Sequence, residues 1–255
     1  MDTLTRDRRE FLKDTIRRTV NFATTDQARG IPPPPMMKPP AKDAEFVELP
    51  AIDKLRGVRR VQLRDAIARR RSRRDFLDER MTLDEVSFLL WATQGVRETP
   101  GPATALRTVP SAGARHAFET YLCVRNVKSL QTGMYRYLPF GHRLVLEHKR
   151  VDPGAALVEG TLGQQWCRRA AVAFVWTVIP YRMEWRYGHA AHKVIALDAG
   201  HVAQNLYLAC QAAGAGTCAI AAYDQERMDA LLGVDGEDEF TIYLAPVGKV
   251  SQSQP

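Results

Sequence analysis

The segment 194–213, VIALDAGHVAQNLYLACQAA, constrains the fold of this 255-residue chain more than any other feature. It is long enough for an extended helix and is apolar on almost every side. A surface helix carries one apolar stripe, whereas a helix that is apolar nearly all round must be covered on several sides. We therefore expect this helix to need more cover than one small domain readily gives.

Strand patterns occur on both sides of this helix in the sequence. Residues 134–149 alternate around a Pro-Phe-Gly turn, which is typical of a hairpin. Residues 170–179 are almost entirely apolar, which indicates a buried strand. Two more strands are predicted at residues 119–124 and 239–248. Because helices and strands do not alternate regularly, the predicted fold class is α+β.

Further helices are predicted, and one of them has both of its ends marked. It begins at Thr82, which has Glu85 three residues later as in a capping box, and it ends at Gly95. Helical spacing also occurs in residues 54–71 and in the charged, amphipathic segment 7–22.

Residues 30–42 separate an N-terminal part from the body of the chain, since they hold six of its fifteen prolines. Such a run favours an extended polyproline II conformation and cannot form a helix or a central strand. We expect residues 1–50 to form a helix and an extended arm that packs over the body or reaches a partner subunit. Residues 51–255 are expected to form the single domain.

Composition argues against several classes of protein. No apolar run reaches the roughly 18–20 residues that a membrane span requires. Residues 7–13, DRREFLK, match the twin-arginine export consensus, but the apolar segment that export also needs does not follow them. The cysteines are widely spaced and include no CxxC pair: Cys123, Cys167, Cys210 and Cys218. This spacing is typical of a reducing compartment, so we expect a cytoplasmic protein without a membrane partner.

The net charge of +7 is concentrated in one region of the chain. Residues 54–80 contain eleven basic and four acidic residues, so the remainder is neutral. The densest part is RRRSRR, residues 69–74. Nucleic-acid-binding surfaces usually interleave aromatic or amide side chains with the basic ones. Here the neighbours are apolar and helically spaced, so nucleic-acid binding is the minor alternative and a bound phosphate remains open.

Two familiar motifs lack the neighbouring sequence features that their usual functions require. The stretch GAGTCA, residues 214–219, matches a dinucleotide-binding fingerprint, but it follows a helix rather than a strand. Gly214 is therefore interpreted as the glycine that ends the helix. His189 and His192 are three residues apart, with His201 further along, but no carboxylate completes a recognisable ligand set. No metal site is predicted.

The order in which several motifs follow one another is more specific to a family than any of these motifs alone. RRSRRDF from residue 70 is followed by TLDEVSFLLWATQG, RTVPSAGARHAFETYLCV, GMYRY, LDAGHVAQNLYLACQAAGAGTCAIAAYD and LAPVGK. Over residues 57–249 this series resembles the nitroreductase-like flavoproteins, and within them the SagB-type dehydrogenase branch. The resemblance implies a three-layer fold with a mostly antiparallel sheet flanked by helices. It also implies an intertwined homodimer that binds FMN noncovalently at the interface.

The resemblance gives the arginine cluster a specific role. In the family pattern R-R-S-x-R, the ribityl phosphate of FMN is held by the residues that correspond to Arg70, Ser72 and Arg74. Arg71 would contribute locally, and Lys249 matches a basic residue near the same phosphate. The chemistry agrees, because a guanidinium fork and a hydroxyl donor suit a phosphate with a charge near −2.

The flavin ring is implied to lie between two small-residue segments. The first comes from the other subunit and comprises Pro110, Ser111, Ala112, Gly113 and Ala114. Small residues let a flat ligand approach the backbone. Ala114 stands where many nitroreductases have an asparagine, so that side-chain contact is lost. In the second segment, the amides of Ala221 and Ala222 would face the N5 and O4 edge.

Azoline-oxidising members of the branch have a Lys-Tyr pair that is linked to catalysis, and Arg186 and Tyr187 occupy its place. Arginine stays protonated and cannot act as a general base, which weakens azoline oxidation as an expectation. Tyr187 remains the acid or base candidate. The resemblance implies an FMN-dependent dehydrogenase that moves a hydride between flavin N5 and a small-molecule or peptide-derived substrate. An NAD(P)H-dependent nitro or quinone reductase is the alternative.

Overall fold

The computed structural model describes residues 2–101 and 103–251. Its centre is a seven-stranded sheet of order β1-β6-β5-β4-β7-β9-β8, in which neighbouring strands pair antiparallel. The strands are β1 (Glu45–Glu48), β4 (Phe118–Val124), β5 (Gly133–Leu138), β6 (Arg143–Lys149), β7 (Val172–Val178), β8 (Ala215–Thr217) and β9 (Phe240–Lys249). A separate pair contains β2 (Val96–Gly101) and β3 (Thr104–Arg107). The predicted hairpin and the three other predicted strands are confirmed.

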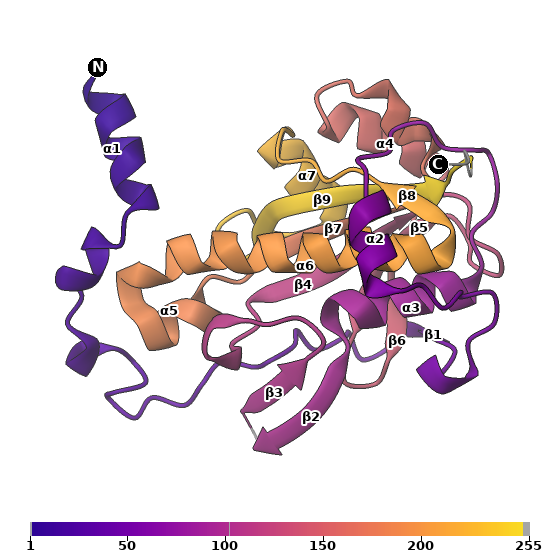
Figure 1. Ribbon diagram of the computed structural model, residues 1–255. Helices are drawn as coiled ribbons and strands as arrows, with labels where there is room; N and C mark the ends of the chain where they lie inside the picture. The colour runs from indigo at the N-terminus through magenta and orange to yellow at the C-terminus, as the bar shows by residue number, and fades with distance from the viewer. Residues whose placement is uncertain (1, 102, 252–255) are drawn as a thin grey trace.

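Helices lie on both faces of the sheet, so the fold has three layers (Figure 1). They are α1 (Thr3–Leu12), α2 (Leu63–Arg69), α3 (Leu83–Gln94), α4 (Pro153–Gly160), α5 (Tyr181–Tyr187), α6 (Ala191–Ala213) and α7 (Gln225–Leu232). The α3 and α6 helices pack on one face, and α4 and α7 pack on the other. This is the α+β architecture that the sequence predicted.

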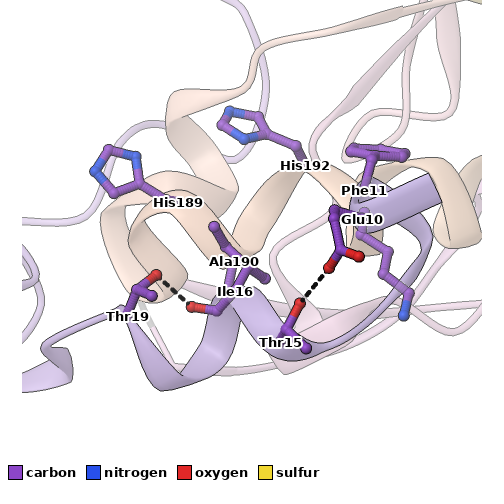
Figure 2. Close-up of a pocket in the computed structure, with 9 residues that line it drawn as sticks. Glu10, Phe11, Thr15, Ile16, Thr19, His189, Ala190 and His192 are labelled. Carbon is purple, nitrogen blue, oxygen red and sulfur yellow. Dashed lines mark hydrogen bonds between the residues drawn. The ribbon is translucent and has the colours of Figure 1, made fainter. Parts of the chain in front are cut away.

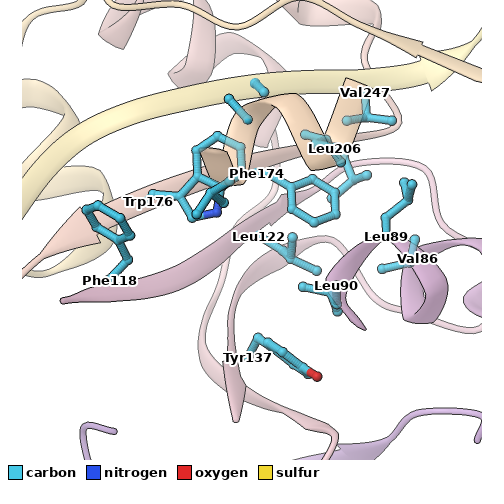
Figure 3. Packing of buried hydrophobic residues seen from close by; sticks show 14 of the residues in the cluster. Val86, Leu89, Leu90, Phe118, Leu122, Tyr137, Phe174, Trp176, Leu206 and Val247 are labelled. Atoms are coloured by element: carbon cyan, nitrogen blue, oxygen red, sulfur yellow. The ribbon is translucent and has the colours of Figure 1, made fainter. Parts of the chain in front are cut away.

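The alternation of side chains along the central strands explains the two cores. Successive residues of a strand point to opposite faces. In β7, Phe174 and Trp176 join the cluster that contains Leu206 of α6, as Figure 3 shows, while Val175 joins the cluster with α4 and α7. Both faces of β7 are covered, which accounts for its almost unbroken apolar sequence.

The marked helix ends are confirmed. Thr82 accepts the backbone N–H of Glu85, and the Glu85 carboxylate accepts the N–H of Thr82 in return, so the capping box is complete. Gly95 follows the last residue of α3. Gly214 ends α6 with φ of 60° and ψ of 32°, a left-handed conformation that glycine adopts without strain.

Two predicted helices are shorter than expected. The prediction for 54–71 is wrong in its first half, because Gly57 has a φ of 79° and the α-helix α2 begins only at Leu63. The prediction for 7–22 is also wrong in extent. Helix α1 ends at Leu12, Lys13 is extended, and a short 3-10 turn follows at Thr15–Arg18. Asp14 and Thr15 both favour local turns over helix continuation.

The proline-rich arm lies on the body of its own chain. Its carbonyl oxygens accept hydrogen bonds from buried side chains: Trp185 Nε1 to Ile31 (2.8 Å), Arg107 to Met36 (3.0 Å) and Arg136 to Lys38 (2.7 Å). Prolines lack an N–H and a polyproline segment makes no internal hydrogen bonds, so its carbonyls are free for such contacts. Helix α1, which precedes the arm, stands apart from the sheet in Figure 1.

Candidate functional site

The arginine cluster runs along the edge of the sheet after α2. The N–H of Arg73 donates to the carbonyl of Thr217 (2.9 Å), and Ser72 forms a parallel bridge with the same residue of β8. The approach depends on Gly216, where an added Cβ would lie 2.7 Å from Cβ of Arg73. Arg73 is half-buried here, unlike the exposed Arg71 and Arg74 on either side of it.

Tyr207 of α6 connects this cluster to the segment after β8. Its hydroxyl lies 3.1 Å from Oγ of Ser72 and accepts the N–H of Ala219 (2.9 Å). The Arg70 guanidinium lies over the Tyr207 ring, 5.3 Å from the centroid. Tyr207 was not predicted from the sequence, since a single tyrosine in an apolar helix gives no signal of such a role.

The charge of the cluster is not balanced inside the chain. Among the described residues, Arg70, Arg71 and Arg74 form no ion pair. Arg74 lies over the ring of Trp166 at 5.8 Å, and the nearby Asp75 is paired at 3.9 Å with Arg169 instead. Uncompensated guanidinium groups beside a serine hydroxyl are suited to a doubly charged anion such as a phosphate.

The predicted amide segment is exposed at the end of the same sheet. Ala221 and Ala222 follow Ile220, which is bridged to Leu244 of β9. The carbonyl of Ala222 accepts a hydrogen bond from Gln164 (3.2 Å). Within residues 2–101 and 103–251, the N–H groups of Ala221 and Ala222 have no hydrogen-bond partner, so both remain available to a ligand.

The resemblance implied that Lys249 lies near the phosphate of FMN, but its ammonium group contacts other parts of the chain. Its ammonium group donates to Glu85 (2.5 Å) and to the carbonyl of Ala213 (3.0 Å), and its side chain is 16% exposed. The lysine therefore connects the capping box of α3 to the last turn of α6. Its role toward a phosphate stays a prediction, and Glu85 would compete with the anion for the ammonium charge.

The turn at residues 110–114 is held by α6. Oδ2 of Asp198 accepts the N–H of Ala112 (3.2 Å), and Oγ of Ser111 accepts the N–H of His116 (3.0 Å). Burial raises the pKa of Asp198, while the hydrogen bonds from Ser111 and Ala112 oppose that shift. Gly113 and Ala114 have φ of 58° and 53°, which keeps the turn tight. Asp198 was another residue that the sequence analysis missed.

The structure brings this turn together with the predicted catalytic pair. Arg186 and Tyr187 end helix α5, and the Arg186 guanidinium lies 5.6 Å from the centre of the Tyr187 ring. An added Cβ on Gly113 would lie 2.6 Å from the Tyr187 hydroxyl and 2.9 Å from Nε of Arg186. Only a glycine leaves room for this contact.

The two parts of the site lie at different points along α6. Asp198 contacts the turn and Tyr207 contacts the arginine cluster. At about 1.5 Å per residue, their positions are separated by about 14 Å along the helix axis. One chain therefore presents a phosphate-type cluster and a turn with its tyrosine as two separate surfaces.

One cavity is lined by none of the site residues described above. It has a volume of about 490 Å³ between the N-terminal helix and the start of α6, and Figure 2 shows His189 and His192 on its wall. His192 lies 2.8 Å from the Glu184 carboxylate. In the described part of the chain, no group of three or more His, Cys, Asp or Glu residues is placed to hold a metal ion. No described helix is long and apolar enough to cross a membrane.

Comparison with solved structures supports the architecture. A candidate nitroreductase from Ralstonia eutropha JMP134 matches with a TM-score of 0.67 and 25% identity, covering 82% of this chain and 90% of that one. Two structures below 25% identity share the fold. The E. coli microcin synthetase McbBCD complex has a TM-score of 0.60 at 18% identity, covering 99% of this chain and 98% of the matched one. A candidate nitroreductase in complex with FMN, from Exiguobacterium sibiricum 255-15, has a TM-score of 0.55 at 13% identity, covering 77% and 92%.

Comparison of sequences identifies the family, whereas the distant structural matches share only the fold. A candidate nitroreductase of Methanocaldococcus jannaschii is 30% identical over 207 residues, which is 81% of this chain and 98% of that protein. The model of the nitroreductase family matches residues 67–249, from α2 to the end of β9. The matched region contains nearly all the residues of the site described above. The chain therefore belongs to the nitroreductase family.

Proposed function

We propose that the protein is an FMN-dependent oxidoreductase of the SagB-type dehydrogenase kind. The observation that carries the proposal is the unbalanced positive charge of Arg70 and Arg74 beside Ser72, together with the free amides of Ala221 and Ala222, which follow the Ala219 that Tyr207 connects to Ser72. These residues fit FMN, because guanidinium and hydroxyl donors suit its phosphate and free N–H groups suit the acceptor edge of its ring. The family's typical cofactor and the FMN complex of a structural neighbour point the same way.

FMN supplies the hydride chemistry when it is bound. The residues of this chain then position the substrate and handle the proton. The Tyr187 hydroxyl, which faces the small-residue turn at Gly113, would donate or accept a proton at Oη. An arginine side chain supplies a fixed charge rather than a base, so Arg186 would act by its charge. Dehydrogenation by this arrangement does not require the lysine that is linked to azoline oxidation.

The alternative is an NAD(P)H-dependent nitro or quinone reductase on the same fold, which membership of the family also fits. We expect that mixing the FMN-loaded protein with NADH or NADPH in the absence of air leaves the flavin absorbance largely unchanged over seconds. A dedicated dehydrogenase obtains its electrons from the substrate and has no need of a nicotinamide site. Dithionite is the positive control and should bleach the flavin fully. Rapid bleaching by either nucleotide would favour the reductase.

A homodimer, the general state of the family, would join the two surfaces that one chain keeps separate. The helix at 194–213 was expected to need more cover than one small domain gives, and in the isolated chain one side of it is uncovered. Leu197 of α6 is 56% exposed, and an added Cβ on Gly200 would have no neighbour within 4 Å. Leu63 and Ile67 of α2, a helix that crosses α6 in Figure 1, are 67% and 56% exposed. These residues would be covered by the second subunit.

We expect Leu197→Arg to raise the dimer dissociation constant by about 100-fold or more. A symmetric interface contains the substitution twice, and exposing one buried leucine costs about 1.5–3 kcal/mol. Sedimentation velocity over a concentration series measures the effect. Val151→Arg is the control, because Val151 is 97% exposed outside this surface. A native protein that is monomeric with FMN bound at micromolar concentration would refute the dimer.

A further inference from the structure

A second cavity lies between the N-terminal arm and the predicted catalytic pair. It has a volume of about 310 Å³ and is lined by Phe22, Thr25, Gln27, Ala28, Arg186 and Tyr187. Its two walls are far apart in the sequence, and the family match at residues 67–249 does not include the arm. We propose that this cavity is the substrate pocket, that residues 22–28 form its outer wall, and that Arg186 binds a carboxylate of the substrate. The inference rests on the proposed function for the chemistry at Tyr187.

Residues 26–31, which lead into the proline-rich arm, are fixed to helix α5, the helix that ends with Arg186 and Tyr187. The N–H of Gln27 donates to the carbonyl of Trp185 (2.9 Å), and Nε1 of Trp185 donates to the carbonyl of Ile31 (2.8 Å). The hydroxyl of Tyr181 at the start of α5 donates to Asp26 (2.7 Å). Three hydrogen bonds from one short helix hold residues 26–31, so this wall is part of the folded structure.

The N-terminal segment also approaches the end of this helix. Gly188 has a φ of 51°, and an added Cβ would lie 3.6 Å from Val20 and 4.0 Å from Thr25. Thr25 is only 9% exposed. Residues 20–25 therefore pass close to the residue that directly follows Tyr187, with room for a methyl group between them.

The charge of the pocket selects the substrate class. Arg186 is the one charged residue among those that line it. In the part of the chain that the structure describes, its guanidinium contacts the Tyr187 ring and forms no ion pair. The neighbouring carboxylates are engaged elsewhere, since Asp26 binds Tyr181 and Glu184 lies 2.8 Å from His192. An anionic group of the substrate would supply the missing partner.

The charge of Arg115 strengthens this preference, whereas Arg17 is paired with Asp14 and adds no net charge. Burial lowers the pKa of Arg115, and the charge of Arg186 lowers it further, which shows that the two guanidinium groups repel each other. Arg17 lies 5.9 Å from the centre of the Phe22 ring and is held by Asp14 at 2.8 Å. An anion beside Arg186 would relieve the repulsion with Arg115.

A carboxylate attached to a small apolar group fits the geometry best. The planar guanidinium fork matches the two oxygens of a carboxylate, and the Phe22 ring offers an apolar face. A volume of about 310 Å³ is at the lower end of ligand pockets and suits a compact molecule. A carboxylate-bearing small molecule is therefore the predicted substrate class.

Benzoate and benzamide are matched probes for this pocket, because they share a ring and differ in charge. Isothermal titration calorimetry of the full-length protein, with its FMN content measured separately, should show benzoate binding about tenfold more tightly than benzamide. Arg186→Gln should abolish the difference, and Arg186→Lys should keep part of it. Equal affinity for the two probes, or no benzoate binding at millimolar concentration, would overturn the assignment of the carboxylate.

The arm is tested with the same probes. Phe22→Ala should weaken both by about fivefold without changing their ratio, because it removes an apolar wall and no charge. Phe11→Ala is the control, since Phe11 lines the larger cavity instead, and it should leave both affinities unchanged. An unaltered affinity in Phe22→Ala, with an unaltered melting temperature, would overturn the role of the arm. A protein that prefers benzoate but takes up no FMN would contradict the proposed function and leave this pocket in place.

Discussion

Glu119→Ala is expected to lower the free energy of unfolding by about 3–5 kcal/mol, because it leaves the buried guanidinium group of Arg182 without a partner. Glu119 lies in the central strand β4 and is 2% exposed. Its carboxylate accepts Arg182 at 2.5 Å and the N–H of Lys38 at 2.7 Å, and it lies 3.7 Å from Arg136. Both arginines are themselves 2% exposed.

The loss of stability should be large because, among the described residues, Arg182 has no second acidic partner. Its Nη1 is already buried without a hydrogen bond among the described residues. The substitution also removes the acceptor for the Lys38 N–H, which is one of the bonds that hold the arm to the sheet. The substitution should therefore weaken the attachment of the arm, and with it the wall of the pocket proposed above, as well as the sheet.

Urea unfolding of Glu119→Ala measures the effect, with Glu48→Ala as the control. Glu48 is also on a strand, but its side chain is 75% exposed and lies 3.9 Å from Arg143. Exposed pairs of this kind contribute about 0–1 kcal/mol, so the control should change little. A loss below about 1 kcal/mol in Glu119→Ala would show that the buried charges are not coupled as described.

Arg70→Ala and Arg74→Ala are each expected to weaken FMN binding by about 10- to 150-fold. One charge-assisted hydrogen bond contributes on the order of 1.5–3 kcal/mol, which corresponds to that range. Arg69→Ala should stay within about twofold, because Arg69 is exposed on the last turn of α2. Equilibrium titration with FMN, followed by flavin fluorescence, measures all three.

The structure changes the choice of controls for this series. Arg73 packs its Cβ and Cγ against Gly216, so Arg73→Ala would alter the sheet edge as well as the charge. Arg69 is therefore the cleaner control. Similar affinities in all the arginine variants would mean that the cluster acts as a diffuse basic patch. That result would revive the nucleic-acid alternative, for which affinity should fall steeply with salt.

The features that the sequence predicted well are those with a local physical signature. Strand β7 was recognisable because both of its faces are buried, and α3 because its capping box is formed by residues three positions apart. Helix α2 was predicted too long, because helical spacing in residues 54–62 gives no warning of the left-handed Gly57.

The site was predicted only where the resemblance supplied it. Tyr207 and Asp198 lie in a helix whose apolar pattern hides their polar contacts with Ser72 and the turn. The pairing of Lys249 with Glu85 joins residues that are 164 positions apart, which no local pattern encodes. The arm was expected to pack on the body or a partner, and its contacts with α5 became visible only in three dimensions.

Equilibrium titration of the flavin-free, full-length protein with FMN measures whether this chain is a flavoprotein. We expect saturable binding with one FMN per chain, a yellow protein after removal of free flavin, and retention of the cofactor by the dimer. A colourless protein that takes up no FMN, although it is folded by circular dichroism, would show that the site described above does not bind FMN.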